Sequence, residues 1–152
     1  MQTGPQRGSL SVDQITGLLR DFREITTEFE QRLGEQLTVN PTDLAAMEHL
    51  IRSGPLGATE LARRLGITPP AVTAVVDRLE ELGHATRVTN PADRRAVVVT
   101  PAPASVTRAM SYLMPMIGDI DATLDGFDAD QQAVIADYLQ RVVAAYRTHI
   151  PA

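Results

Sequence analysis

Residues 55–83 read PLGATELARRLGITPPAVTAVVDRLEELG, a run that carries the signals of two short helices in direct succession. The first helix is predicted over about 58–65, because Gly66 is suited to end it in a left-handed conformation. Thr68 is suited to cap the second helix, and Pro69 favours its first position. Two helices that are joined through so short a glycine-containing turn match helix-turn-helix geometry.

An apolar stripe along the second helix predicts the face that this helix buries. The stripe recurs at spacings of three and four residues and consists of Val72, Val75, Val76, Leu79 and Leu82. Ile67 precedes the cap and is expected to pack on Val72 as a hydrophobic staple. Gly83 is then expected to end the helix.

Two short runs rich in β-branched residues follow, at 84–88 and 96–99, and they predict a β-hairpin. His84 is interpreted as a polar residue that enters this hairpin. The tip between the two runs reads Asn90-Pro91-Ala92-Asp93-Arg94-Arg95. Two adjacent guanidiniums on a turn can reach phosphates or a narrow minor groove. Asp93 is expected to hold one of them in place by an ion pair.

The N-terminal part of the chain predicts two helices ahead of this core. Residues 1–8 are polar and contain glycine and proline, so we expect them to be loose. Ser11 is suited to cap a long amphipathic helix over roughly 11–35. Asn40 is suited to cap a second helix, which Gly54 ends.

The C-terminal part of the chain predicts two further helices. Apolar residues from Val106 to Leu124 recur at a mean spacing of about 3.5, which suits packing of one helix on another. Pro115 lies within this run and is expected to kink the helix, because proline removes one backbone donor. Asp128 is suited to cap the last helix. The predicted fold class is therefore mostly α, with a small β-hairpin wing.

The predicted elements form one domain, residues 1–152, with a winged helix-turn-helix lobe over about 41–100. The helices over about 11–38 and 104–149 lie outside this lobe and carry long apolar stripes. Such stripes must be buried, and we expect a second copy of the chain to cover them.

The charge of the chain is divided unevenly along its length. The net charge is −5, but residues 52–95 hold seven arginines against five acidic residues, a net of +2. The remainder holds seven arginines against 14 acidic residues, a net of −7. This layout is expected if only the middle of the chain faces a polyanion.

Several classes of function are disfavoured by composition. The chain has no cysteine, and His49, His84 and His149 lack metal-ligand spacing. The carboxylates between Asp119 and Asp130 lack the residue order of a calcium-binding loop. No glycine-rich phosphate loop is present, so we expect no enzyme, no metal and no cofactor. No apolar run is long enough to span a membrane, so we expect a cytoplasmic protein without a membrane partner.

The order of elements and the two stretches 55–83 and 87–99 resemble the MarR family of bacterial transcription regulators. Asp-Arg-Leu-Glu at 77–80 and Asp-Arg-Arg at 93–95 stand where that family's motifs place them. The resemblance implies a triangular homodimer that binds a pseudo-palindromic operator in double-stranded DNA. It also implies a transcription regulator, most often a repressor, that a small-molecule effector often releases. Arg95 would be the minor-groove residue, positioned by Asp93, with Arg94 on a phosphate.

The helix that starts after Thr68 would enter a major groove, yet it departs from the family pattern. Many relatives carry an arginine where Ala74 stands, and Arg to a guanine edge is the commonest specific contact. We therefore expect base discrimination to depend on thymine methyls, DNA shape and the hairpin tip. The candidate DNA-binding residues are Thr42, Thr59, Arg64, Pro69, Pro70, Thr73, Arg78, Asp93, Arg94 and Arg95.

Each of these residues also has a simpler interpretation. The polar and charged side chains can be solvated surface groups, and Thr42 and Thr59 can be ordinary helix-start residues. Met110, Tyr112 and Met114 are candidates for a ligand cleft, although apolar stripes are more often core. The missing arginine at position 74 and the acidic net charge leave a second function open, a winged-helix module that binds another protein and no longer binds DNA.

Replacement Arg95→Ala should weaken operator binding by about 1–3 kcal/mol, because it removes a contact to DNA without touching the core. Gel shift at fixed salt measures the affinity, and circular dichroism checks that the variant is folded. Wild-type affinity in the folded variant would show that Arg95 does not contact DNA.

Overall fold

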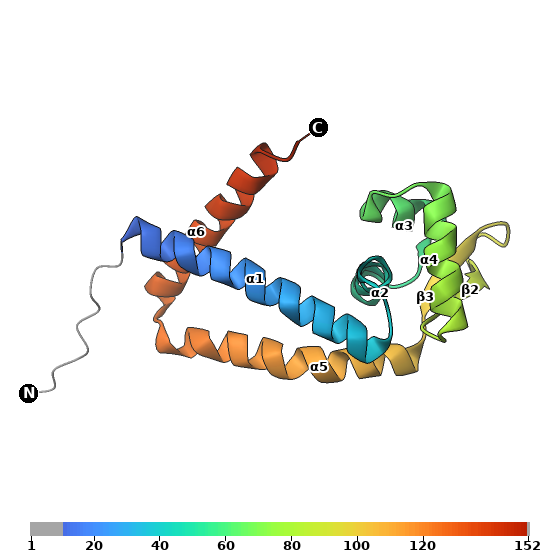
Figure 1. The fold of residues 1–152 in the computed structure, drawn as a ribbon, viewed down its shortest axis with the longest axis horizontal. Coiled ribbons are helices and arrows are strands. Elements are labelled where there is room, and N and C mark those ends of the chain that lie inside the picture. Colours follow the sequence, from blue (N-terminus) through green and yellow to red (C-terminus); the bar gives the residue numbers. More distant parts are fainter. Residues whose placement is uncertain (1–10, 152) are drawn as a thin grey trace, which may run out of the picture. The chain divides into compact units, whose positions relative to one another are not determined.

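The computed structural model describes residues 11–151, and Figure 1 shows its helices and strands. The expectation for residues 1–8 lies outside this range. The elements are α1 (Val12–Leu37), α2 (Pro41–Ser53), β1 (Leu56–Gly57), α3 (Ala58–Leu65), α4 (Pro69–Glu81), β2 (Ala85–Thr89), β3 (Val97–Pro101), α5 (Pro103–Ala122), the 3-10 helix η1 (Thr123–Gly126) and α6 (Ala129–Thr148). This mostly helical fold with a small antiparallel sheet is the fold class that the sequence predicts.

The chain divides into two compact units, one up to Ala109 and the other from Met110 onward. The first unit contains α1 to β3 and the start of α5. The second contains the rest of α5, η1 and α6.

Helix starts follow the local capping signals closely. The hydroxyl of Ser11 accepts the Gln14 amide at 3.3 Å, and the Gln14 side chain accepts the Ser11 amide at 2.8 Å. Asn40 Oδ1 accepts the Asp43 amide at 2.9 Å and begins α2 in the same way. These contacts are made between residues three apart, so local sequence is sufficient to predict them.

The turn between α3 and α4 requires a residue with positive φ. Gly66 has φ +65°, and its amide and that of Ile67 close the end of α3 through hydrogen bonds to Arg63 and Ala62. The hydroxyl of Thr68 then accepts the Ala71 amide at 3.4 Å and begins α4. The helix-turn-helix that the sequence predicts is confirmed.

A third strand, β1, was not predicted. Its two residues pair with β3, Leu56 opposite Val99 and Gly57 opposite Val98, so the sheet order is β1-β3-β2. A strand of two residues has no periodicity to detect, and only its partner reveals it. The hairpin itself is confirmed, with Arg87 of β2 opposite Val99 of β3.

The core of the first unit lies between α4, α2, α3 and the inner residues of the sheet. Side chains below 2 % exposure include those of Leu37, Leu50, Leu61 and Leu79. The prediction that Leu82 belongs to the buried face is wrong, because α4 ends at Glu81 and Leu82 is 45 % exposed.

His84 does precede β2, but its interpretation as a merely polar entry residue is wrong. The imidazole is 7 % exposed, and its Nε2 donates to the carbonyl of Leu37 at 2.8 Å. Its Nδ1 lies 2.8 Å from the hydroxyl of Ser105. One buried ring therefore links the end of α1, the turn after α4 and the start of α5.

The second unit is built around two helix segments and the turn between them. α5 continues through Pro115, and the kink expected there stays a prediction. Asp128 caps α6 through the Gln131 amide at 2.9 Å, as predicted. The side chain of Gln132 donates to the carbonyls of Leu124 and Phe127, which fixes the turn onto α6.

Replacement His84→Ala should lower the free energy of unfolding by about 2–4 kcal/mol, because it removes the donor to a buried carbonyl and opens a cavity. Denaturant unfolding followed by circular dichroism measures this change. His149→Ala is the matched control, since His149 is exposed at the end of α6. Equal stability of the two variants would contradict the structural role of His84.

Candidate nucleic-acid interface

The buried stripe of α4 determines which of its residues face outward. Val72, Val75 and Val76 are at most 2 % exposed, and Leu79 is fully buried. The opposite face is exposed and carries Pro69, Pro70, Ala71, Thr73, Ala74 and Asp77. This outward face lies on the element that sits beside the β2–β3 hairpin in Figure 1.

Arg78 of α4 is held by a carboxylate from α2. Its Nε and Nη2 donate to both oxygens of Asp43 at 2.9 and 2.7 Å. The hydrogen bonds raise the pKa of Arg78. The carboxylate of Asp43 is 2 % exposed, whereas the Arg78 side chain is 44 % exposed. Neither interpretation from the sequence, a phosphate contact or a solvated residue, includes this partner.

The pair of Arg78 and Asp43 is a part-buried, bidentate interaction between residues 35 positions apart, in which the carboxylate is the buried partner. Such geometry restricts both position and angle, because two parallel hydrogen bonds form only when the groups are coplanar. The pair therefore fixes α4 relative to the first turn of α2.

Arg87 of β2 makes a second link to α4, which no sequence pattern predicts. Its guanidinium donates to Asp77 at 2.7 Å and also to Glu80. Its backbone amide donates to Glu80 at 2.7 Å. The wing strand β2 is thereby attached to α4 at two carboxylates. Only the fold brings these residues together, so sequence spacing could not reveal the contact.

Arg64, a candidate phosphate contact, also has hydrogen-bond partners within the protein. Both Arg63 and Arg64 donate to Glu60, and Arg64 Nη1 also donates to Ser53 Oγ at 2.5 Å. Hydrogen bonds from Arg63 and then from Arg64 lower the pKa of Glu60 from 4.5 to about 2. Two arginines thus share one carboxylate on the first helix of the pair, so this cluster keeps a net charge of +1 and neither cation is without a partner.

The wing tip is shaped by side chains that bond to backbone. Asn90 Oδ1 accepts the Ala92 amide at 3.0 Å, and Asp93 Oδ1 accepts the Arg95 amide at 3.0 Å. The expected ion pair from Asp93 to a wing guanidinium is therefore corrected: Asp93 shapes the backbone of the turn instead. Residues 91–95 are all exposed.

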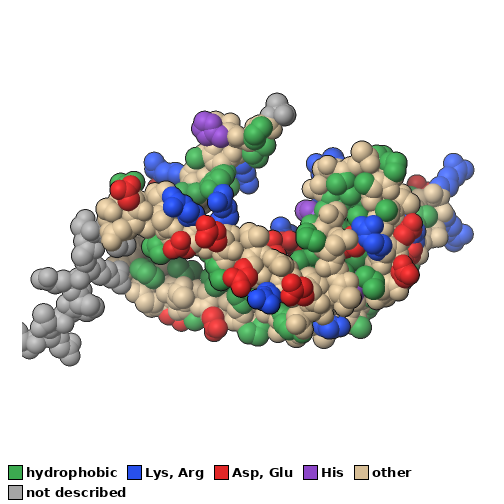
Figure 2. Space-filling view, viewed as in Figure 1, with side chains coloured by type: hydrophobic (Ala, Val, Ile, Leu, Met, Phe, Trp, Pro, Cys, Tyr) green, Lys and Arg blue, Asp and Glu red, His purple; other side chains and the backbone are tan. Residues whose placement is uncertain are grey.

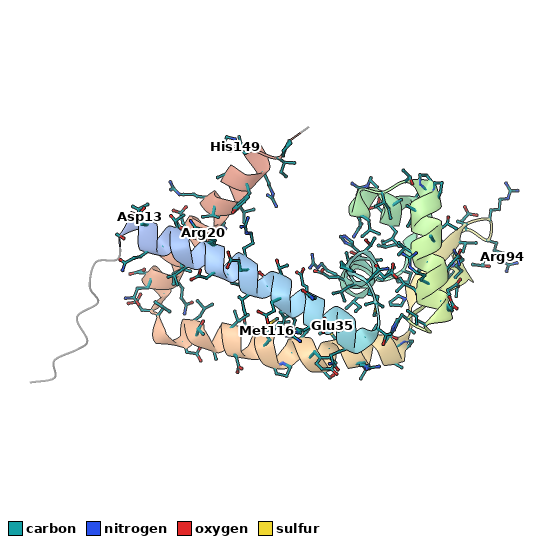
Figure 3. All side chains as sticks on the ribbon, viewed as in Figure 1. Asp13, Arg20, Glu35, Arg94, Met116 and His149 are labelled. Carbon is teal, nitrogen blue, oxygen red and sulfur yellow. The ribbon has the colours of Figure 1, made fainter. Side chains whose placement is uncertain are left out.

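The arginines of the basic segment that lack a carboxylate partner lie at this tip. Of the seven arginines in 52–95, five are ion-paired: Arg52, Arg63, Arg64, Arg78 and Arg87. Within residues 11–151, no ion pair is found for Arg94 or Arg95. Figure 3 shows Arg94 pointing away from the lobe, and Figure 2 shows basic side chains projecting beyond a neighbouring surface that carries acidic ones.

Two helix starts carry the remaining candidate residues, Thr59 and Thr42. Thr59 is the second residue of α3, whose first turn has no side-chain cap, so its amides remain available to an anion. Thr42 is the second residue of α2, where Asn40 already caps one amide. Both threonines are exposed.

A hollow of about 430 Å³ lies between α1 and α2 in the first unit. Its lining combines apolar residues with three glutamates: Thr27, Glu30, Gln31, Gly34, Glu35, Val39, Pro41, Leu44, Ala45 and Glu48. The candidate ligand residues Met110, Tyr112 and Met114 are not among them. They lie on α5 in the second unit, where Met110 is half-buried and the other two are exposed.

Residues 11–151 offer neither a metal-binding cluster nor a membrane-spanning helix. No group of three or more histidine or carboxylate side chains there is arranged to hold a metal ion. No helix in that part of the chain has the length and apolar character to cross a membrane.

A helix-turn-helix, a two-stranded wing and a basic wing tip define the class of winged helix-turn-helix proteins. A sequence profile of the MarR family matches residues 37–96, which contain α2 to the wing tip. A relative from Bacillus subtilis, the uncharacterized HTH-type transcriptional regulator YcgE, is 35 % identical over 116 residues. That match covers 76 % of this chain and 75 % of the relative. The chain belongs to the MarR family and is a transcription regulator, not an enzyme.

Further similarities agree with this assignment. The HTH-type transcriptional repressor MdtR of Bacillus subtilis is 34 % identical over 76 residues, which cover 50 % of this chain and 48 % of that protein. The structure of a MarR-like regulator from Thermotoga maritima superposes with a TM-score of 0.67 at 23 % identity, covering 91 % and 99 % of the two chains. NadR in complex with 4-hydroxyphenylacetate gives 0.58 at 20 % identity, covering 93 % and 97 %.

Replacement Arg78→Met should lower the free energy of unfolding by about 2–4 kcal/mol, because Asp43 then stays buried without its partner. The double variant Asp43→Asn/Arg78→Met should lose less than the sum of the two single variants, as measured by denaturant unfolding.

Arg141→Met is the control for this cycle, since Arg141 pairs with Asp137 on the exposed surface of α6. Its effect should stay within about 0.5 kcal/mol. Additive single effects at Asp43 and Arg78 would show that the pair does not fix α4.

Proposed function

We propose that this regulator binds a pseudo-palindromic operator as a homodimer and acts as a repressor. The observation that carries the proposal is that Arg94 and Arg95 at the wing tip are exposed and have no ion-pair partner. They lie beside α4, the recognition helix, whose outward face is also exposed. Cations at this position serve the phosphates or the narrow minor groove that flanks a major-groove helix.

Each candidate residue then has a distinct role. Arg95 enters the minor groove, Arg94 contacts a phosphate, and Asp93 maintains the turn that presents them. Thr42 and Thr59 bind phosphates through helix N-termini. Arg64 and Arg78, whose guanidiniums already have carboxylate partners, support the lobe and approach DNA only through their exposed edges.

The homodimer is supported by apolar side chains that each unit leaves exposed. On α1 these are Val12, Ile15, Leu18, Phe22 and Ile25. On α6 they are Val134, Tyr138, Leu139, Val143 and Tyr146. Contiguous apolar surface of this kind is characteristic of an interface, and a two-fold dimer presents two recognition helices to one palindrome.

An effector that releases the operator is supported by the hollow between α1 and α2. Its volume of about 430 Å³ lies in the range of small-molecule sites. The related fold of NadR was solved with 4-hydroxyphenylacetate. Met110, Tyr112 and Met114 of α5 stay separate candidate ligand contacts, since none of them lines this hollow. The sign of regulation follows the relative MdtR, which is named a transcriptional repressor. The proposed site of action is the cytoplasm, because the chromosome lies there.

Selection of bound duplexes from random DNA tests the proposal directly. It should enrich two inverted half-sites with centres about 10 base pairs apart or a multiple of that spacing. Four wing arginines in the dimer make about four cationic contacts, so log K should fall with log salt at a slope of about −3.6. Light scattering at micromolar concentration should give the mass of a dimer.

The outcomes separate this function from its alternative. No enriched sequence, together with a flat salt dependence, would favour a winged-helix module that binds another protein. A monomer by light scattering would contradict the two-fold arrangement.

A further inference from the structure

We infer that α4 reads the 5-methyl groups of pyrimidines in the major groove, so that thymine and 5-methylcytosine are recognised by the same carbon contacts. This inference rests on the proposed operator binding and specifies what feature of the bases is read. It follows from the hydrogen-bonding state of each outward group on the first half of α4.

The first turn of α4 has few donors to offer a base. Pro69 and Pro70 have no amide hydrogen, and both rings are exposed. The next amide, that of Ala71, donates to the hydroxyl of Thr68 at 3.4 Å. A helix N-terminus ordinarily presents several free amides, and here three successive positions present none to the groove.

The second turn is also devoid of a free donor. The hydroxyl of Thr73 donates to the carbonyl of Pro69 at 3.1 Å, so its hydrogen is used within the helix. Ala74 is exposed and has only its methyl group. No asparagine, glutamine, lysine or arginine occurs between Gly66 and Asp77, so none reaches a base from this face.

The polar group that remains on this face is the carboxylate of Asp77, one turn beyond Thr73. It accepts a hydrogen bond from Arg87 of β2 at 2.7 Å. A carboxylate can accept from the amino group of cytosine, which gives a second form of readout. That amino group is present in cytosine and 5-methylcytosine alike, so comparison of these two bases isolates the methyl group.

Carbon contacts are what this surface can make with a base edge. The C5-methyl of thymine projects into the major groove, and alanine and the threonine methyl are side chains that contact it. Removal of one buried methyl from such a contact costs about fourfold in affinity. 5-Methylcytosine carries the same methyl at the same position, so methylation of a cytosine in the half-site should strengthen binding.

The test uses the dimeric full-length protein and a duplex selected from random DNA. Each thymine is replaced in turn by deoxyuridine, which removes only the methyl, and affinity is measured by fluorescence anisotropy at fixed salt. Two or more positions per half-site should lose about fourfold each. At such a position cytosine should bind more weakly than thymine, and 5-methylcytosine should recover about fourfold relative to cytosine.

Replacement Thr73→Ser assigns one of these methyls to the protein, because serine keeps the hydroxyl bond to Pro69 and removes only the carbon. The deoxyuridine loss should disappear at one position in each half-site, because each protomer of the dimer contributes one Thr73. Thr107→Ser is the matched control, since the Thr107 hydroxyl bonds to the Pro103 carbonyl at 3.1 Å in α5. This control should keep the wild-type pattern of losses.

The possible results distinguish the two proposals. Tight, sequence-specific binding with no loss at any deoxyuridine position would overturn methyl readout and leave operator binding intact. If the deoxyuridine losses are unchanged in Thr73→Ser, Thr73 does not contact the thymine methyl. Ala74 and the proline rings would then make this contact. Failure to select any sequence would overturn both proposals.

Discussion

The rotation of α4 about its own axis is set by four side chains that cannot be exposed. Val72, Val75, Val76 and Leu79 lie on one stripe and are nearly or fully inaccessible to solvent. Burial of a side chain of this size contributes about 1.5–3 kcal/mol, so rotation of the helix by one position would cost several such contributions. Burial of the apolar stripe therefore determines which residues of α4 face outward. The composition of this outward face determines what α4 can recognise.

Two ionic contacts fix the position of α4 within the lobe. Asp43 holds α4 through Arg78, and Arg87 attaches the wing strand to Asp77 and Glu80 on the same helix. Both contacts use carboxylates to neutralise arginines, so within residues 52–95 the arginines without an ion-pair partner are those of the wing tip. The structure thus separates two tasks: helix α4 provides carbon surface, and the wing provides charge. Such a division is consistent with a chain whose net charge is −5.

The sequence predicts what neighbouring residues decide. The caps at Ser11, Asn40, Thr68 and Asp128 are contacts across three residues, and all four are confirmed. Contacts between residues distant in the chain could not be predicted from the sequence. The strand β1, the burial of His84 and the pairing of Arg78 with Asp43 all depend on how the elements pack. For the same reason the residue types at the wing tip were predictable, whereas the bonding of Asp93 to backbone was not.

In the proposed complex with DNA, α4 lies in a major groove while the wing tip lies in the adjacent minor groove. Because the chain has no cysteine, Ala74→Cys and Ala92→Cys can each carry a single tethered iron chelate that cleaves nearby DNA. On the selected operator, the chelate at position 92 should cleave symmetrically at minor-groove sugars flanking each half-site, and that at position 74 within the half-site. Cleavage from position 74 without cleavage from position 92 would contradict the account.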